Sequence, residues 1–324
     1  MTSSLPPATL RRSVGAVAGL LAGVASAVVA APAAAADRRI AIVAPIAGNP
    51  FHDAVGEGCR ARAAALGGLV CTFHAPGAGD SRNQGAIVRD LVADHVAALA
   101  VSAALVSEVL PAIAAARAAG VPVVAYDADL PVDARDAFVG TDARDFGRTL
   151  GASLGRWKPD GGTYALLTGE AGSRSLADRV AGVRDALGPR WREIAGSPAV
   201  TSGEPREAAR LVDRLLLEHP DLDAVVSVGA WPFLADDSWR EIAGRHKDRF
   251  DRARTVIVVA DALPIERRLV RDGLGHVLVG QRPADMGARI ADLLAARLAG
   301  RNTPEIVLVG FDVLTRRDLL AKPD

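Results

Sequence analysis

Aromatic residues are scarce in this chain, because phenylalanine, tryptophan and tyrosine together make up only 4% of its 324 residues. Half of the sequence is nevertheless apolar, and alanine, valine, leucine and glycine dominate it. Small apolar side chains of this kind are typical of helices packed closely onto parallel sheets. The length is sufficient for two domains with separate cores.

The chain also lacks an excess of either charge. It has 38 lysine and arginine residues against 38 aspartate and glutamate residues, and no long basic segment. Proteins that bind nucleic acid carry a basic patch that matches the phosphate backbone. We therefore expect no nucleic-acid partner.

Several motifs that carry chemistry are missing from the sequence. It has no P-loop, no G-x-S-x-G turn and no G-x-G-x-x-G after the first expected strand. The six histidines are scattered, without H-E-x-x-H or an acid-rich calcium loop. We expect a protein that is not an enzyme and that uses no cofactor and no metal. A cation held by Asp127-Ala128-Asp129 is the alternative that the pattern leaves open.

Only two cysteines are present, Cys59 and Cys71. Each is expected ~10 Å from the turn that joins a helix ending near Leu66 to the strand after Gly68. A disulfide between them is one interpretation, which requires an oxidising compartment. Two small buried thiols are the other. No second cysteine or histidine pair is available for zinc.

The first 36 residues have the features of a secretory signal. Arg11 and Arg12 form a positive start, Val14 to Ala31 is apolar, and Ala34-Ala35-Ala36 matches an A-x-A cleavage site. We expect cleavage after Ala36 and a periplasmic protein. The alternative is an N-terminal membrane anchor, because the apolar run is almost long enough to span a bilayer.

Short apolar runs alternate with amphipathic segments through the rest of the chain. The expected strands are 39–44, 70–74, 97–101, 121–126, 137–140, 164–168, 224–228, 256–260 and 277–280. The expected helices are 50–66, 81–94, 106–119, 175–187, 205–219, 236–249, 264–272 and 284–299. This alternation indicates parallel sheets that are covered on both faces. The predicted fold class is α/β, with two similar doubly wound parallel-sheet lobes.

Polar and aromatic residues follow five of the apolar strands at the point where each strand ends. In chain order they are Asn49, Phe51 and His52, then Asp127 and Asp129, then Trp231, then Asp261, and finally Gln281. Ligands of open parallel sheets bind at the carboxyl ends of the strands. Carboxylates, amides and aromatic rings together suit a small polyhydroxylated molecule.

Structural roles compete with ligand binding at several of these positions. Asn49 could cap the helix that follows it, and Asp127 and Asp261 could cap helices or form hydrogen bonds at a hinge. Trp231 could belong to a core, although a glycine- and proline-flanked turn is an unusual place for a core residue. His52 could be a polar neighbour rather than a ligand contact.

Seven motifs follow one another between Arg39 and the C-terminus. They are IAIVAPIAGNPFHDAVGEG, GVPVVAYDADLP, FVGTDARDFGRTLG, ADRVAGVRDAL, HPDLDAVVSVGAWP, VIVVADALP and VLVGQRPADMG. In this order and spacing they resemble periplasmic sugar-binding proteins of the ribose-binding type, the solute receptors of ABC importers. The resemblance implies a type I periplasmic binding protein fold, in which three crossovers join the two lobes.

The resemblance also places the crossovers and the lobes. Crossovers are expected near Thr141-Asp142, near Asp261, and near Gln281-Arg282 or beyond. Residues 1–36 would be the signal peptide. Residues 37–141 plus 282–310 would form the N-terminal lobe, and residues 142–281 plus 311–324 the C-terminal lobe.

Arg179, three residues before Gly182, matches the binding arginine of these proteins. The full set of expected ligand-binding residues is Asn49, Phe51, His52, Asp127, Asp129, Arg179, Trp231, Asp261 and Gln281. Three positions depart from the family pattern. Ala128 stands where ribose binders have arginine, His52 stands where many relatives have a second aromatic residue, and Trp231 lies where many have asparagine nearby.

The expected function is capture of a small sugar or polyol by a monomer that closes at its hinge and delivers the ligand to an ABC permease. A receptor that presents the ligand to a chemoreceptor or sensor kinase is the alternative on the same fold. An enzyme on an α/β scaffold is a third hypothesis. A sugar-responsive repressor is disfavoured, because a signal segment occupies the place of its DNA-binding helices.

Overall fold

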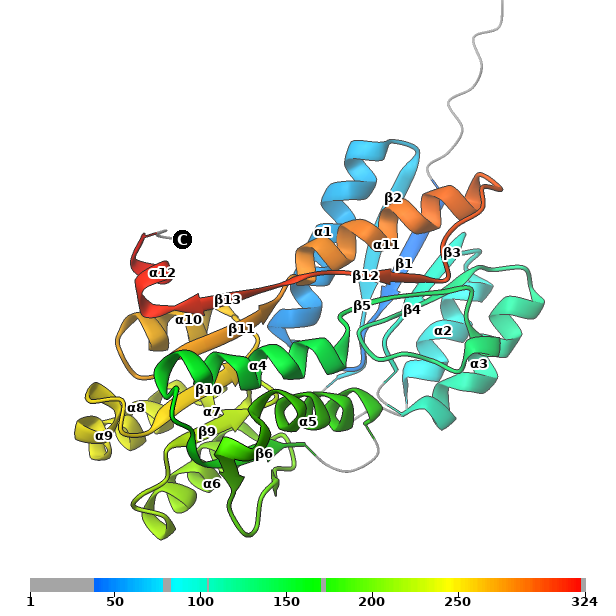
Figure 1. Cartoon of the computed structure of the whole chain (residues 1–324). Coiled ribbons are helices and arrows are strands. Elements are labelled where there is room, and N and C mark those ends of the chain that lie inside the picture. The colour runs from blue at the N-terminus through cyan, green and yellow to red at the C-terminus, as the bar shows by residue number, and fades with distance from the viewer. Residues whose placement is uncertain (1–37, 78–82, 104, 170–172, 322–324) are drawn as a thin grey trace, which may run out of the picture. The chain divides into compact units, whose positions relative to one another are not determined.

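The computed structural model describes residues 38–77, 83–103, 105–169 and 173–321, in which Figure 1 shows two separate sheets covered by helices. The predicted signal peptide and its cleavage site lie outside these residues. In the part of the chain that is described, no helix is long and apolar enough to cross a membrane.

The first sheet is parallel, and its strands lie in the order β12-β5-β4-β3-β1-β2. They are β1 (Arg38–Val43), β2 (Leu69–His74), β3 (Ala98–Val101), β4 (Val123–Tyr126), β5 (Ala137–Gly140) and β12 (Ile306–Leu308). Successive residues of a strand face opposite sides. In β1, Ile40 and Ile42 therefore pack with α1 (Pro50–Leu66) and α11 (Pro283–Leu298), and Ala41 and Val43 with α2 (Gln84–Ala93) and α3 (Val106–Ala118).

The second sheet has the order β13-β11-β10-β9-β6-β7, with β8 paired to β6. Its strands are β6 (Gly162–Thr168), β7 (Trp191–Glu193), β8 (Ala199–Val200), β9 (Ala224–Ser227), β10 (Val256–Ala260), β11 (Val277–Gln281) and β13 (Phe311–Thr315). One face packs with α4 (Ala143–Trp157) and α5 (Arg174–Leu187). The other packs with α6 (Pro205–Glu218), α7 (Trp231–Leu234), α8 (Asp236–Arg245), α9 (Lys247–Asp251), α10 (Pro264–Arg271) and α12 (Arg316–Ala321).

The chain passes between the two sheets three times. It leaves the first sheet after Gly140, returns to it after Gln281, and leaves again between Leu308 and Phe311. The prediction of a crossover near Asp261 is wrong, because β10 and β11 on either side of Asp261 are parallel neighbours in one sheet. The lobe boundaries at 141/142, 281/282 and 310/311 remain predictions that agree with the strand content of the sheets.

Helix α4 was not expected from the sequence, yet it forms one of the closest helix contacts with α5. A Cβ atom on Gly147 of α4 would lie 2.1 Å from the carbonyl oxygen of Arg179, and one on Gly182 would lie 2.1 Å from that of Arg144. Glycine lowers helix propensity, which hides α4 in the sequence. The same glycines let two backbones approach more closely than any side chain would allow.

A matching glycine contact joins α1 to α11 on the first sheet. A Cβ atom on Gly58 would lie 2.0 Å from the carbonyl oxygen of Ala284, and one on Gly287 would lie 2.0 Å from that of Val55. Helices α1 and α5 both carry candidate site residues near their first turns. The two glycine contacts therefore set how those residues stand against the sheets.

Other differences from the expected elements concern short or irregular segments. The segment 236–249 is two helices, α8 and α9, and β13 runs antiparallel to β11. Strands β7, β8, β12 and β13 and helices α7 and α12 were not expected. All six are short, and short segments carry too few residues for a hydrophobic period to be recognised.

Cys59 of α1 and Cys71 of β2 form a disulfide, with Cα atoms 6.0 Å apart. Of the two interpretations left open by the sequence, the structure therefore has the disulfide. Both cysteines lie in the buried cluster between the first sheet and helices α1 and α11. The bridge ties α1, whose first residues reach the candidate site, to the edge strand β2.

Candidate functional site

The first turn of α1 lies at the carboxyl end of β1. Asn49 is the N-cap of this helix, and its side-chain oxygen accepts a hydrogen bond from the Phe51 backbone N–H at 3.0 Å. Pro50 takes the first helical position, where its missing N–H costs nothing. The capping role predicted for Asn49 is present, and its side-chain amide N–H groups are not used by the cap. Phe51 and His52, the next two residues, are buried.

Asp127 directly follows β4 of the first sheet, and Asp261 directly follows β10 of the second sheet. The two residues therefore occupy equivalent places in the two lobes. Both have left-handed backbone conformations, with φ of 57° at Asp127 and 75° at Asp261. Such values are uncommon for residues other than glycine, although aspartate and asparagine tolerate them best. Strained backbone of this kind clusters at ligand sites, where it aims a side chain that regular structure would turn away.

Arg179 lies in α5 and is 8% exposed. Its Nη1 donates to the carbonyl oxygen of Val228 at 2.9 Å, and its guanidinium carbon lies 4.6 Å from the centre of the Phe146 ring. Its Nε has no hydrogen-bond partner. Among the described residues Arg179 makes no ion pair, which is costly for a buried charge.

The charges of Arg179, Asp127 and Asp261 act on one another across the two lobes. Burial raises the pKa of Asp127 to about 6, and the Arg179 guanidinium opposes this rise. Burial also raises the pKa of Asp261, against Arg179 and a hydrogen bond from Gln281, while the Asp127 carboxylate raises it further. The structure therefore groups two carboxylates and one guanidinium without joining them directly.

Gln281, the last residue of β11, donates from Nε2 to the Asp261 carboxylate at 2.8 Å. Its Oε1 is buried and has no hydrogen-bond partner. Gln281 thus orients Asp261 and keeps one acceptor unused.

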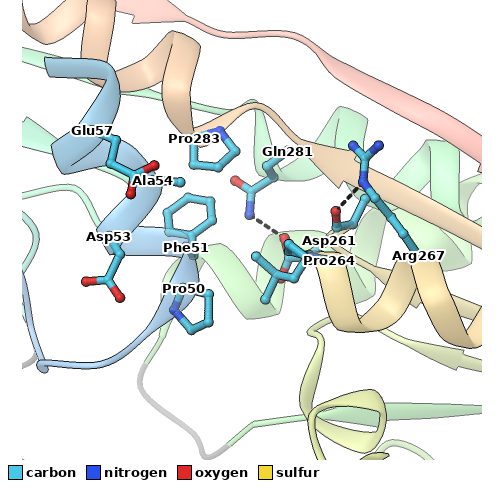
Figure 2. A pocket seen from close by; sticks show the side chains of 12 residues that line it. Pro50, Phe51, Asp53, Ala54, Glu57, Asp261, Pro264, Arg267, Gln281 and Pro283 are labelled. Carbon is cyan, nitrogen blue, oxygen red and sulfur yellow. Dashed lines mark hydrogen bonds between the residues drawn. The ribbon is translucent and has the colours of Figure 1, made fainter. Parts of the chain in front are cut away.

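A cavity of about 560 Å³ is lined by three of the expected ligand residues, Phe51, Asp261 and Gln281, whereas Asn49, His52, Asp127 and Arg179 are not part of its lining. Figure 2 shows the Phe51 ring beside Gln281, with Asp53 and Glu57 on the α1 side and Asp261 and Pro264 opposite. The complete lining is Pro50, Phe51, Asp53, Ala54, Glu57, Asp261, Ala262, Leu263, Pro264, Arg267, Gln281 and Pro283. The lining comes from both lobes, because α1 packs on the first sheet and the β10–α10 loop follows a strand of the second sheet.

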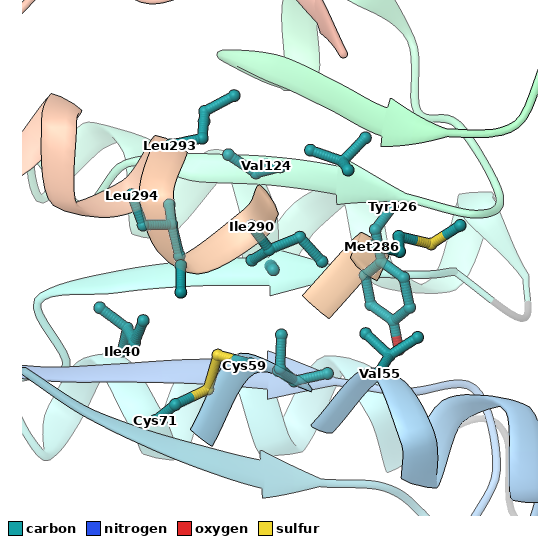
Figure 3. Packing of buried hydrophobic residues seen from close by; sticks show 14 of the residues in the cluster. Ile40, Val55, Cys59, Cys71, Val124, Tyr126, Met286, Ile290, Leu293 and Leu294 are labelled. Carbon is teal, nitrogen blue, oxygen red and sulfur yellow. A yellow bond between two sulfur atoms is a disulfide. The ribbon is translucent and has the colours of Figure 1, made fainter. Parts of the chain in front are cut away.

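His52 is 5% exposed and makes a hydrogen bond of 3.3 Å between its Nδ1 and the hydroxyl of Tyr126, the last residue of β4. Figure 3 shows the Tyr126 ring reaching toward Val55 of α1, beside Met286 of α11. Burial lowers the pKa of His52 to about 4, although the carboxylates of Asp53 and Asp261 oppose the shift. His52 is therefore neutral at physiological pH.

Two expected ligand residues are engaged elsewhere. The Asp129 carboxylate accepts from Arg135 at 3.0 Å and from the Leu130 backbone N–H at 2.8 Å. Trp231 packs against the apolar clusters on both faces of the second sheet, and its ring covers Gly229. Neither residue lines the cavity of Figure 2. Their contact with a ligand stays a prediction.

Sequence reasoning did not single out Tyr126 or Glu266. Tyr126 is the last residue of an expected apolar strand, and nothing in the chain's pattern links it to His52. Glu266 is fully buried, accepts from the Leu263 N–H at 2.8 Å, and leaves Oε1 without a partner. Burial and the Asp261 charge raise the pKa of Glu266 well above its usual range. Glu266 is the third residue of α10, a position where glutamate often accepts from the N-cap backbone N–H. That pattern predicts the capping bond but not the burial of Glu266 near Asp261.

Among the described residues, no group of three or more histidine, cysteine, aspartate or glutamate side chains is arranged to hold a metal ion. The Asp129 carboxylate, the second acid of the Asp127-Ala128-Asp129 segment, is engaged by Arg135. What the site offers chemically is a set of hydrogen-bond donors and acceptors beside an aromatic ring.

Comparison with known proteins gives one family match. The family described as periplasmic binding protein domain matches residues 40–302. No curated protein matches the sequence.

Several solved structures share the fold at low sequence identity. An ABC transporter solute-binding protein from Burkholderia graminis, in complex with D-arabinose, matches with a TM-score of 0.79 at 23% identity, covering 90% of this chain and 99% of that one. A solute-binding protein from Bacillus halodurans with bound myo-inositol has a TM-score of 0.75 at 18% identity, over 89% and 97% of the two chains. The XylFII–LytSN complex matches at 0.72 and 20%, over 87% and 99%. The predicted type I periplasmic binding protein fold, with two α/β lobes, is confirmed.

Proposed function

Because the chain belongs to the periplasmic binding protein domain family, we propose that it captures a small sugar or polyol between its two lobes and delivers it to an ABC importer. The similar proteins crystallised with D-arabinose and myo-inositol support this ligand class. No step of the proposed function changes a covalent bond, so the protein acts by binding alone.

One observation carries the proposal. Asp127 and Arg179 come from different lobes, their charges interact, and yet no hydrogen bond or ion pair joins their charged groups in the described structure. Arg179 is 8% exposed and Asp127 is partly buried. A buried charge without a partner costs a protein several kcal/mol of stability. A ligand whose hydroxyl groups bond to both would satisfy them together.

The proposed contacts divide by the chemistry of each side chain. The carboxylates of Asp127 and Asp261 accept hydrogen bonds from ligand hydroxyls, and Arg179 and the amide of Asn49 donate to ligand oxygens. The Oε1 of Gln281 is a further acceptor. Phe51 presents an apolar ring to the C–H face of a sugar. A hydroxyl both donates and accepts, so a polyol matches this mixed set.

Ligand binding would also hold the lobes together. Asn49, Phe51 and Asp127 belong to the first lobe, whereas Arg179 and Asp261 belong to the second. A ligand shifts an open–closed equilibrium only through contacts that improve on closure. Contacts supplied from both lobes have this property, and hinge closure around a ligand is established for periplasmic binding proteins as a class.

Thermal denaturation with a panel of pentoses, hexoses and polyols tests the proposal. At a ligand concentration 100 times the Kd, binding adds ~2.7 kcal/mol of stability and raises the melting temperature by roughly 5–10 °C. Asp261→Asn keeps the backbone conformation accessible and should weaken binding roughly 10- to 100-fold, as expected for a lost bond to a charged group. Asp237→Asn, at an exposed position in α8, is the control. A panel without any stabilising compound, or equal binding by Asp261→Asn, would refute the proposal.

A ligand-presenting receptor for a sensor kinase or chemoreceptor is the second candidate. The similarity to the XylFII–LytSN complex favours it, because LytSN is a separate chain bound to that protein. Uptake of labelled ligand should disappear on deletion of the gene if the protein serves an importer. Unchanged uptake with a lost transcriptional or chemotactic response would support the receptor role instead.

A further inference from the structure

Tyr126 and His52 form a buried pair that the strand-end pattern does not explain. Tyr126 is 0% exposed and His52 is 5% exposed. The Tyr126 hydroxyl lies 3.3 Å from Nδ1 of His52, and the two rings meet edge to face with centroids 5.8 Å apart. His52 also meets Phe51 edge to face, with centroids 5.2 Å apart. The imidazole thus contacts both an aromatic residue of the cavity lining and a phenol.

The acceptors available to the Tyr126 hydroxyl determine which atom of this pair donates. A buried tyrosine hydroxyl needs an acceptor for its proton. The described structure provides one partner for the Tyr126 hydroxyl, and that partner is Nδ1 of His52. If Nδ1 carried the proton instead, the buried phenol proton would have no acceptor. The phenol therefore donates, and the proton of the neutral imidazole is on Nε2.

The surroundings of His52 agree with a proton on Nε2. The charged groups whose fields reach the ring are Asp53 on its own helix and Asp261 after β10, and both are acceptors. No hydrogen bond of Nε2 occurs within the described residues. Nε2 is thus a donor without a partner within the described residues, in the first turn of α1 and next in sequence to Phe51, which lines the cavity.

We propose that Tyr126 is a positioning residue that holds His52 as a neutral Nε2–H donor, and that His52 then selects ligands with an oxygen acceptor at this point of the cleft. The inference rests on the proposed function and deepens it. The donors of the site would be Arg179, Asn49 and His52, set against the acceptors Asp127, Asp261 and Gln281.

Burial lowers the pKa of His52 to about 4, so the imidazole is uncharged when it donates its hydrogen bond. A histidine that stays neutral between pH 5.5 and 8 donates one hydrogen bond without adding charge to the site. It would therefore favour an uncharged hydroxyl or ring oxygen over a group that needs a full cation.

Long-range ¹H–¹⁵N NMR spectra of the ligand-free protein test the geometry directly, because the two nitrogens of a neutral imidazole have distinct chemical shifts. The His52→Gln spectrum assigns the His52 signals by their loss. We expect the Nε2–H tautomer from pH 5.5 to 8, and a mixture of tautomers in Tyr126→Phe, which removes the hydroxyl and keeps the ring. A proton on Nδ1 at pH 7, or an unchanged tautomer in Tyr126→Phe, would overturn the proposal.

Titration calorimetry with D-arabinose, D-glucose and myo-inositol tests the role in binding. Tyr126→Phe should weaken binding about 3- to 10-fold, as expected for one hydrogen bond that loses its orientation. The amide nitrogen of glutamine matches ring Nε2, and that of asparagine matches Nδ1. His52→Gln should therefore weaken binding less than His52→Asn. The reverse order would contradict the proposal. The NMR result stands whether or not any of these sugars binds, so failure of the proposed function is recognised separately by the thermal panel.

Discussion

At the scale of single residues, Asp127 and Asp261 show why strand ends carry the site. Each follows a strand whose residues are fully buried, and each adopts positive φ. An apolar strand followed by an acid predicts where the carboxylate lies along the chain. It does not predict the left-handed turn, because that conformation is imposed by neighbours from other segments.

The raised pKa of Asp127 yields a prediction about stability. A carboxyl group whose pKa is about 6 in the folded protein and 3.8 when unfolded stabilises the fold below pH 3.8, and this contribution is lost as the pH rises through 6. The loss amounts to at most ~3 kcal/mol. Asp127→Asn should therefore be more stable than the natural protein at pH 7, without ligand, and should bind ligand more weakly. Calorimetric melting at pH 4 and pH 7 measures both proteins.

The comparison has a clear control. Asp237→Asn changes an exposed aspartate and should follow the natural protein at both pH values. If the stability difference between Asp127→Asn and the natural protein were the same at pH 4 and pH 7, Asp127 would not be a strained, desolvated acid. Residues that bind a ligand commonly lower the stability of the ligand-free protein, as we expect for Asp127.

At the scale of elements, the contact between α4 and α5 places Arg179. Gly147 of α4 lies directly against the backbone of Arg179, and Gly182 of α5 against that of Arg144. Backbone that touches backbone leaves no flexible side chain to move aside. The position of the guanidinium over Phe146 therefore depends on two residues that have no side chain.

Gly147→Ala should destabilise the protein by about 1–3 kcal/mol, the usual cost of overpacking. It should also weaken ligand binding, because α5 and Arg179 must shift. Gly155→Ala is the matched control in the same helix, since a Cβ there meets no atom within 4 Å. The control should gain roughly 0.5–1 kcal/mol from the better helix propensity of alanine. Urea denaturation measures both variants, and equal midpoints would contradict the assigned contact.

Sequence reasoning recovered most elements but missed α4, and the reason is physical. Three glycines at four-residue spacing lower the helix propensity of 143–157, and the close contact made by two of them, Gly147 and Gly151, exists only when α5 is in place. By contrast, the helix beginning at Pro50 was predicted from its Asn-Pro start, a local signal that needs no partner.

At the scale of the whole molecule, two lobes contribute to one cleft, and the chain crosses between them three times. The apolar contact between the lobes includes Ala230 and Leu263 of the second lobe, which join the core cluster beside α1 and α11. This contact requires the two lobes to lie close together. It agrees with the proposed closure around a ligand.

Export of the molecule remains a proposal that a direct measurement can check. Protein recovered from the periplasm should have Asp37 as its first residue, because the small residues at Ala34 and Ala36 match the requirement for signal cleavage. Mass spectrometry of the intact protein gives the answer. Replacement of Ala36 by leucine should block processing and retain the protein at the membrane. An unprocessed chain that begins at Met1 would favour the N-terminal anchor.

The amino-acid sequence by itself determined the alternation of strands and helices, the sites of the candidate carboxylates, and the cysteine pair close enough to bond. These are local or short-range properties, set by hydrophobic period, helix caps and the distance along the chain. Only the tertiary structure decided that Asp129 pairs with Arg135, that the chain stays in one sheet on either side of Asp261, and that Tyr126 meets His52. The Tyr126–His52 contact joins residues 74 positions apart, which meet only because of how the helices pack onto the sheets. Asp129 and Arg135 are six positions apart, in a segment without a hydrophobic period that would predict its path.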